Sequence, residues 1–281
     1  MTTISDTRPS AAVPTVPRPA YKVTHRRVLR SEWAKFWSVR STWITVALAL
    51  IALIGFGTIA ALRYKSMIGS DRHIDRDFLD ATSVSLTQFG VNFGQLALGV
   101  LGVLFAAGEY TTGSIRSTLT AVPKRLPVLW SKVAVYGVVA FVIGTVGAFA
   151  GFLLTNTIVS GTAAHLSLTD NGVLRSLFGA GLYLGLVGVI AAALGAILRS
   201  VAGGISAFIA VIMLIPGLLS LLPTSWQSHV GPYLPSNAGD AIYTLHQQSD
   251  LLTPGRGALV LLGWTVLAVA GAAWRLVSRD A

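Results

Sequence analysis

The stretch Glu109–Lys132 reads EYTTGSIRSTLTAVPKRLPVLWSK and separates two long apolar runs, Leu86–Ala107 and Val133–Val159. Neither run contains a charged residue. Each is longer than the roughly 20 helical residues needed to cross the hydrocarbon core of a bilayer. The stretch between them is basic, contains glycine and proline, and is too short to form a domain. We therefore predict two membrane-spanning helices joined by a compact loop, and we interpret this loop as a docking element.

The composition of the whole chain also points to a membrane. Only 11% of the 281 residues are charged and 53% are hydrophobic, whereas a soluble domain carries about 25% charged residues. The formal net charge is +10. The charges cluster beside apolar runs, where orientation in a membrane and contact with anionic lipids explain them better than nucleic acid does. We predict an all-α, multi-pass membrane protein that contacts membrane lipids and binds no nucleic acid.

The residue types that many catalytic sites require are missing or scattered. The chain has no cysteine, which excludes disulfides, thiolate metal sites and cysteine nucleophiles. Its five histidines lack the spacing of a helical metal site. It also contains no GxxxxGK[ST] phosphate loop, which an ATPase needs. We predict that the chain is not an enzyme and has no cofactor of its own, so that ATP and Mg²⁺ would be bound by a separate subunit.

The N-terminal part of the chain divides into two segments. Residues 1–23 are rich in Thr, Ser, Ala and Pro and lack the apolar stretch of a secretory signal, so we predict a disordered cytosolic tail. For residues 24–41 we predict an amphipathic helix lying in the inner head-group region, because apolar residues recur at helical spacing. A plain basic flank of the first span is the alternative. The predicted face comprises Leu29, Trp33, Phe36, Trp37 and Arg40.

Residues 42–281 are predicted to form a domain of six transmembrane helices. The fourth and fifth spans are separated only by Arg199, so they form either a tight hairpin or a kinked pair, and Pro216 should bend the fifth. The six apolar stretches are Trp43–Leu62, Leu86–Ala107, Val133–Val159, Ser176–Leu198, Ser200–Pro223 and Gly257–Trp274.

The placement of basic residues predicts the orientation. With both termini cytosolic, 15 of the 21 Lys and Arg residues lie in cytosolic segments and six lie in outer segments. Such a bias is what the positive-inside rule describes. The outer segments also contain seven aspartates, Asp240 among them.

The cores of the predicted spans contain no Asp, Glu, Lys, Arg or His, which disfavours proton-coupled carriers and channels with charged rings. The strongest polar signal inside a span is Gln88, Asn92 and Gln95, whose i, i+4, i+7 spacing puts three amides on one helical face. An unpaired amide is costly in hydrocarbon. This face therefore either lines a translocation path or forms a helix or subunit interface.

The loop after the second span has a helical pattern of its own. Gly108 and Gly113 allow backbone bends on either side of Glu109. The segment Ser114–Val122 is predicted to form a short helix that Pro123 ends. A loop that only follows the lipid surface is the alternative.

Two stretches, GEYTTGSIRSTLTAVPKRLPVLWSK (Gly108–Lys132) and RVLRSEWAKFWSVRSTW (Arg27–Trp43), resemble the permease subunits of bacterial ABC transporters of the type-2 exporter class. The resemblance implies that the amphipathic helix is an elbow on the inner leaflet. It also implies that loop 108–132 contains a coupling helix that docks into an ATP-binding-cassette subunit, and that residues 224–256 are an extracellular insertion. The implied contact residues are Glu109, Thr112, Gly113, Arg116, Thr118, Leu119 and Pro123.

The expected function is therefore that of a permease in a bacterial cell membrane, with both termini cytoplasmic, exporting a hydrophobic or amphipathic compound. It would pair with itself or a close relative, and a separate ATPase subunit would energise it. One alternative is a non-transporting membrane scaffold or sensor. Another is a lipid-modifying enzyme, whose only candidate groups are the outer aspartates Asp71, Asp75, Asp77 and Asp80.

Overall fold

The structure is a computed structural model that describes residues 24–68, 78, 80–111, 113, 125–245 and 252–278. Within these ranges every regular element is a helix. Six helical stretches are long and apolar enough to cross a membrane: Arg40–Ile68, Ser83–Thr111, Leu126–Ile158, Val173–Leu198, Val201–Leu219 and Pro254–Ser278. The all-α fold with six candidate spans is thereby confirmed.

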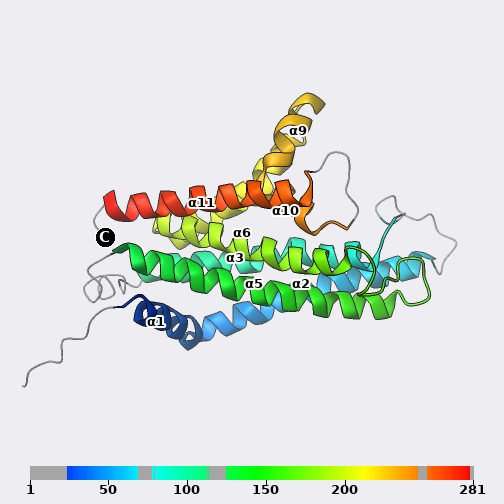
Figure 1. The fold of residues 1–281 in the computed structure, drawn as a ribbon, viewed down its shortest axis with the longest axis horizontal. Coiled ribbons are helices and arrows are strands. Elements are labelled where there is room, and N and C mark those ends of the chain that lie inside the picture. The colour runs from blue at the N-terminus through cyan, green and yellow to red at the C-terminus, as the bar shows by residue number, and fades with distance from the viewer. Residues whose placement is uncertain are drawn as a thin grey trace, which may run out of the picture.

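The long helices lie alongside one another in a bundle (Figure 1). Helix α1 and the last residues of α11 lie at one end, here called the α1 end, and α10 lies towards the other, called the α10 end. The elements are α1 (His25–Ser38), α2 (Arg40–Ile68), α3 (Ser83–Thr111), α5 (Arg125–Ile158), α6 (Val173–Leu198), α7 (Val201–Ile209), the π-helix η2 (Ala210–Leu214), α8 (Ile215–Leu219), α9 (Thr224–Val230), the 3₁₀ helix η3 (Gly231–Tyr233), α10 (Pro235–Tyr243) and α11 (Pro254–Ser278).

Helices α3 and α6 form the centre of the bundle. Within their most apolar windows 56% and 67% of residues are buried, against 17% for the fifth candidate span. The helices also extend beyond the apolar runs that predicted them, since α2 includes Arg63 and Lys65. Hydrophobicity marks only the part of a helix that suits hydrocarbon, whereas the backbone hydrogen bonds continue into the polar ends.

The fourth and fifth spans form a tight hairpin. Arg199 adopts a left-handed conformation with φ 52° and ends α6, and its N–H donates to the Gly195 carbonyl. The next residue, Ser200, caps α7 by accepting a hydrogen bond from Gly203. Further along, the π-helical turn η2 directly precedes α8, whose first turn contains Pro216. A π-helical turn accommodates the missing proline donor without ending the span.

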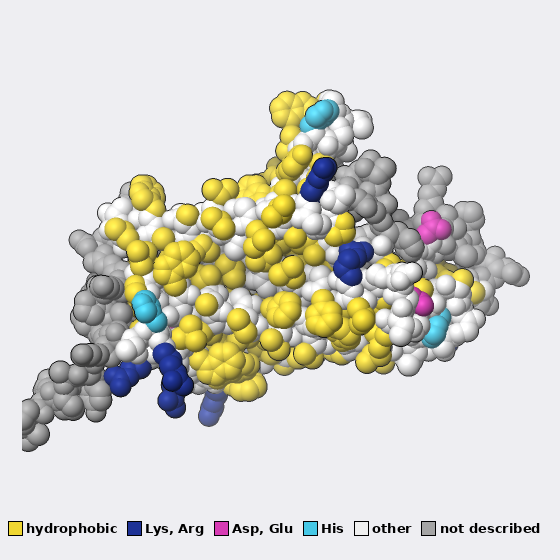
Figure 2. All heavy atoms as spheres, viewed as in Figure 1, with side chains coloured by type: hydrophobic (Ala, Val, Ile, Leu, Met, Phe, Trp, Pro, Cys, Tyr) yellow, Lys and Arg dark blue, Asp and Glu magenta, His cyan; other side chains and the backbone are white. Residues whose placement is uncertain are grey.

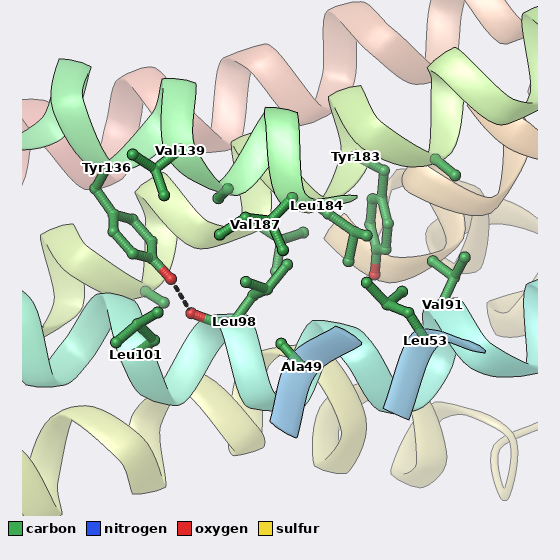
Figure 3. Packing of buried hydrophobic residues seen from close by; sticks show 14 of the residues in the cluster. Ala49, Leu53, Val91, Leu98, Leu101, Tyr136, Val139, Tyr183, Leu184 and Val187 are labelled. Carbon is green, nitrogen blue, oxygen red and sulfur yellow. Dashed lines mark hydrogen bonds between the residues drawn. The ribbon is translucent and has the colours of Figure 1, made fainter. Parts of the chain in front are cut away.

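Close approach of small residues holds the core together. Gly90 of α3 faces the backbone of Leu53 on α2, while Gly94 and Gly147 face the Leu53 side chain from α3 and α5. Figure 3 shows Leu53 and Ala49 of α2 near residues of α3 and α6, and the Tyr136 hydroxyl of α5 donating to the Leu98 carbonyl. These contacts pack α2, α3, α5 and α6 at short range, as small residues permit in membrane helices.

Helix α1 packs against the bundle through only part of the predicted apolar face. Val28, Glu32 and Phe36 are its buried residues. Leu29 and Trp33, which were predicted to share a face with Phe36, are 45% and 46% exposed. The helix ends at Ser38, and Arg40 begins α2. The helix therefore has one side buried in the protein and a neighbouring apolar side exposed.

The glycine contact between α2 and α3 yields a stability prediction. A Cβ atom added at Gly90 would lie 1.8 Å from the Leu53 carbonyl oxygen, so Gly90→Ala should destabilise the protein by about 1–3 kcal/mol through forced helix displacement. Gly55 of α2 has open space around it, so Gly55→Ala should be neutral or stabilising. Thermal unfolding in detergent, followed by circular dichroism, compares the two variants. Equal midpoints would contradict this packing.

Candidate functional site

Four charged side chains from three helices meet at the α1 end of the bundle. The Lys132 Nζ atom of α5 lies 2.8 Å from Glu32 Oε2 of α1 and 3.0 Å from Glu109 Oε1 of α3. The Lys35 Nζ atom of α1 lies 2.8 Å from Glu32 Oε1 and 3.1 Å from Glu109 Oε1. Each ammonium group therefore bridges both carboxylates. We call this group of four residues the charge cluster.

The chain brings the charge cluster together from distant positions. Glu32 and Lys35 are three residues apart on α1, so they lie on neighbouring positions of one helical face. Glu109 lies in the last turn of α3, and Lys132 lies in the third turn of α5. The residues between them include segment 112–124. The cluster thus joins both ends of this segment to α1.

The charge cluster is largely removed from water. The side chains of Glu32 and Lys132 are 1% and 6% exposed, while that of Lys35 is 36% exposed. The Lys132 ammonium also lies 4.2 Å from the centre of the Phe105 ring. An ion in such surroundings loses several kcal/mol of hydration, which close pairing must offset. The two negative charges of the carboxylates equal the two positive charges of the ammonium groups. The cluster is therefore neutral as a whole and suited to joining helices.

The pairing also affects the titration of Lys35. Burial lowers the pKa of Lys35, but the hydrogen bonds and negative charges of Glu32 and Glu109 outweigh it, so the pKa is raised above its usual 10.5. The group therefore remains charged at neutral pH. Its contribution to stability is present below pH 10.5 and is lost only as the pH rises through the raised pKa.

A cavity of about 510 Å³ lies beside the charge cluster. Its apolar wall includes Phe36, Leu104 and Phe105, and Lys35 and Glu109 also line it. Residues of α1, α2, α3 and α7 contribute to it. The cavity therefore combines a hydrophobic surface with charged groups at the α1 end.

Of the residues predicted to contact an ATPase, two lie in the described part of the chain. Glu109 belongs to the charge cluster. Gly113 has φ +71°, a left-handed conformation that suits glycine, and its N–H donates to the Tyr110 carbonyl in the last turn of α3. The predicted bend at Gly108 is wrong, because Gly108 lies inside α3. Thr112, Arg116, Thr118, Leu119, Pro123 and the whole of the predicted helix Ser114–Val122 lie outside the described residues.

The three amides of α3 have three different surroundings. Gln88 donates from Nε2 to the Tyr243 carbonyl of α10 at 2.9 Å. Gln95 accepts from the Tyr183 hydroxyl of α6 and donates to the Asn92 carbonyl at 3.0 Å. The Asn92 side chain is exposed and forms no hydrogen bond with any residue that the structure describes. Two of the amides thus contact neighbouring elements, and the third points out of the bundle.

Side chains of α6 fix α10 at the other end of the bundle. Arg175 donates to the carbonyls of Ile242 at 3.0 Å and Thr244 at 2.9 Å. The Tyr243 hydroxyl donates to the Asp240 carboxylate. Burial raises the pKa of Asp240, although the hydrogen bond from Tyr243 opposes this. The sequence analysis grouped Asp240 with the polar outer segments. In the structure its carboxylate accepts a hydrogen bond inside α10, the helix that α6 holds in place.

Sequence reasoning did not assign roles to Glu32, Lys35 or Lys132. One feature of the sequence could have pointed to the charge cluster: the chain contains only two glutamates, Glu32 and Glu109, and both belong to it. Of the outer aspartates proposed for enzyme chemistry, Asp71, Asp75 and Asp77 lie outside the described residues and Asp80 is exposed. Within the described ranges no group of three His, Cys, Asp or Glu side chains could hold a metal ion.

Comparison of the chain with protein-family models and with curated proteins gave no match.

Because its charges are paired, removal of one cation from the charge cluster should lower the stability of the protein strongly. Lys132→Met leaves the buried carboxylate of Glu32 and the partly buried carboxylate of Glu109 beside a single ammonium group. It should cost about 3–5 kcal/mol of stability, as removal of one partner of a buried pair does. The double variant Glu32→Gln/Lys132→Met should recover part of the loss. Thermal unfolding in detergent measures the changes.

The control for this test is Lys65→Met, because Lys65 is an exposed cation at the opposite end of α2. It should leave the unfolding midpoint unchanged. If Lys132→Met behaved like this control, the charge cluster would not hold the helices together.

Proposed function

We propose that this chain is the permease subunit of an ATP-driven transporter of the ABC type that exports a hydrophobic or amphipathic compound. The observation that carries the proposal is the charge cluster, because it ties both ends of segment 112–124 to α1. A segment that receives force from another subunit needs such an attachment to the membrane helices. The resemblance of Gly108–Lys132 to the coupling region of these permeases supports the same assignment.

The proposed location is a bacterial cell membrane, with the α1 end and both termini in the cytoplasm. The excess of Lys and Arg in the segments at this end supports the orientation. In Figure 2 hydrophobic side chains cover the middle of the visible face, and several Lys and Arg side chains gather over α1. The exposed Leu29 and Trp33 would contact the inner leaflet, with Arg26 and Arg30 among its head groups.

In the proposed mechanism, closure of the ATPase subunits displaces segment 112–124. Glu109 on α3 and Lys132 on α5 move with its two ends. Because both residues pair with the charges of α1, the three helices move together. The glycine contacts of α3 and α5 with Leu53 then carry the displacement into the centre of the bundle. The protein would thereby alternate between inward-facing and outward-facing states.

A second permease chain, identical or closely related, completes the proposed assembly. Asn92 lies well inside the candidate span Ser83–Thr111 and its amide is exposed. An amide in contact with lipid tails lacks hydrogen-bond partners, and this is costly. Phe56 and Phe93, both exposed, stack beside it with ring centres 3.7 Å apart. A second chain packed on this surface would supply the partner for the amide.

Co-purification tests the proposal. The tagged chain, isolated from its own host in mild detergent, should retain a subunit that contains a phosphate loop and hydrolyses ATP. Arg116→Glu should reduce the retained ATPase activity by about tenfold or more, the effect of losing 1.4 kcal/mol of binding. Lys65→Glu provides a charge reversal of the same kind at the opposite end of α2 and should have no effect.

Two results would contradict the proposal. Recovery of a partner without a phosphate loop would favour a scaffold or sensor. Equal ATPase recovery with Arg116→Glu and Lys65→Glu would show that segment 112–124 does not dock the ATPase.

A further inference from the structure

We infer that the groove between α5 and α11 binds the acyl chain of a membrane phospholipid. This α5–α11 groove has a volume of about 660 Å³. Side chains of α5 and α11 form its walls, and Val189 of α6 lies between them. In Figure 1 α6 lies between α5 and α11, and Figure 2 shows hydrophobic side chains over the same face. The inference rests on the proposed membrane location and is independent of any ATPase.

The chemistry of the lining selects hydrocarbon. Among the described residues that line the groove, Trp130 carries an indole N–H and Thr265 a hydroxyl. The Thr265 hydroxyl donates to the Leu261 carbonyl at 2.8 Å and is therefore already satisfied. A ligand with polar atoms at this depth would leave them without partners, at a cost of several kcal/mol each. An acyl chain has no such atoms.

The lining also disfavours an extended peptide. The backbone N–H and C=O groups of such a peptide would find no partners along this apolar surface. A hydrocarbon chain carries no such groups.

The length of the groove matches one leaflet. Its α5 wall extends from Trp130 to Val138, which at 1.5 Å per residue is about 12 Å. One leaflet of a hydrocarbon core that is about 30 Å thick has a depth of roughly 15 Å. The groove therefore covers most of the depth that a single acyl chain occupies.

Tryptophans indicate which end holds the head group. Trp130 and Trp274 are 53% and 73% exposed, and both lie on the side of the groove nearer the α1 end. Tryptophan favours the membrane–water interface. The head group then lies beside these rings, and the chain runs towards Val138 and Thr265. In the proposed orientation the lipid belongs to the inner leaflet.

Small side chains create the groove. Ala134 and Gly137 of α5 face Ala270 and Ala273 of α11 across it. A Cβ atom at Gly137 would lie 2.8 Å from Val189 Cγ2, so the glycine leaves space at the floor. Ala134 and Ala270 are exposed, so larger side chains at these positions would fill the groove without entering the core.

Photo-crosslinking tests the inference. The protein is placed in nanodiscs of phosphatidylcholine that carries a diazirine midway along one acyl chain, and crosslinked residues are identified by mass spectrometry. Labelling of 133–138 and 265–273 should be about tenfold higher than labelling of the exposed apolar face of α2 at Leu48 and Ile51, a preference that corresponds to 1.4 kcal/mol. The double variant Ala134→Leu/Ala270→Leu should lose this excess.

Ala47→Leu is the matched control, because Ala47 is an exposed alanine on α2, outside the groove. It should leave the labelling of the groove unchanged. Equal labelling of the groove and of α2 in the unmodified protein would overturn the inference, whether or not the filled variant folds. Undiminished groove labelling in the folded double variant would also overturn it, as would crosslinks at these residues between two copies of the chain.

Discussion

The pairing of the buried Lys132 with the carboxylates of Glu32 and Glu109 is the constraint on which the α1 end of the structure depends. Charges removed from water must keep close partners, so Glu32 and Glu109 are held at hydrogen-bond distance from the same ammonium group. Helix α1 cannot leave α3 and α5 without exposing these charges or leaving some of them unpaired. Aromatic packing strengthens the restraint, because the Phe36 ring of α1 lies 5.2 Å from the Phe105 ring of α3. The helix that precedes the first span is therefore part of the bundle.

Helix α3 connects this constraint to the opposite end of the molecule. It has 29 residues, a length of about 43 Å at 1.5 Å per residue. Near its ends it carries Glu109 in the charge cluster and Gln88 bonded to α10. Its glycines keep it in close contact with α2 and α6 along the way. A displacement at segment 112–124 would thus act on a helix that packs against α2, α5, α6 and α7.

Hydropathy and length predicted the six spans because both are properties of a continuous stretch of sequence. The sequence could not distinguish a hairpin from a kinked pair at Arg199. The backbone conformation decides between them, because the left-handed φ of Arg199 ends α6 and reverses the chain. The charge cluster could not be derived, because its members come from three separate helices. That pairing also explains how α1 packs on the bundle. Burying Glu32 against Lys132 turns Val28 and Phe36 inwards and leaves Leu29 and Trp33 outside. Hydrophobic periodicity indicated the apolar residues of α1 but not which of them the bundle would bury.

The charge cluster fixes α1 to the helices at both ends of segment 112–124, and the distance between these helices tests this most directly. The chain has no cysteine, so spin labels can be attached to Leu29→Cys on α1 and Leu126→Cys on α5, both exposed positions, and their separation measured by double electron–electron resonance in nanodiscs. One narrow distance distribution is expected in the otherwise unmodified protein and in Lys65→Met, and a broadened or shifted distribution in Lys132→Met. An unchanged narrow distribution in Lys132→Met would contradict a restraining role of the charge cluster.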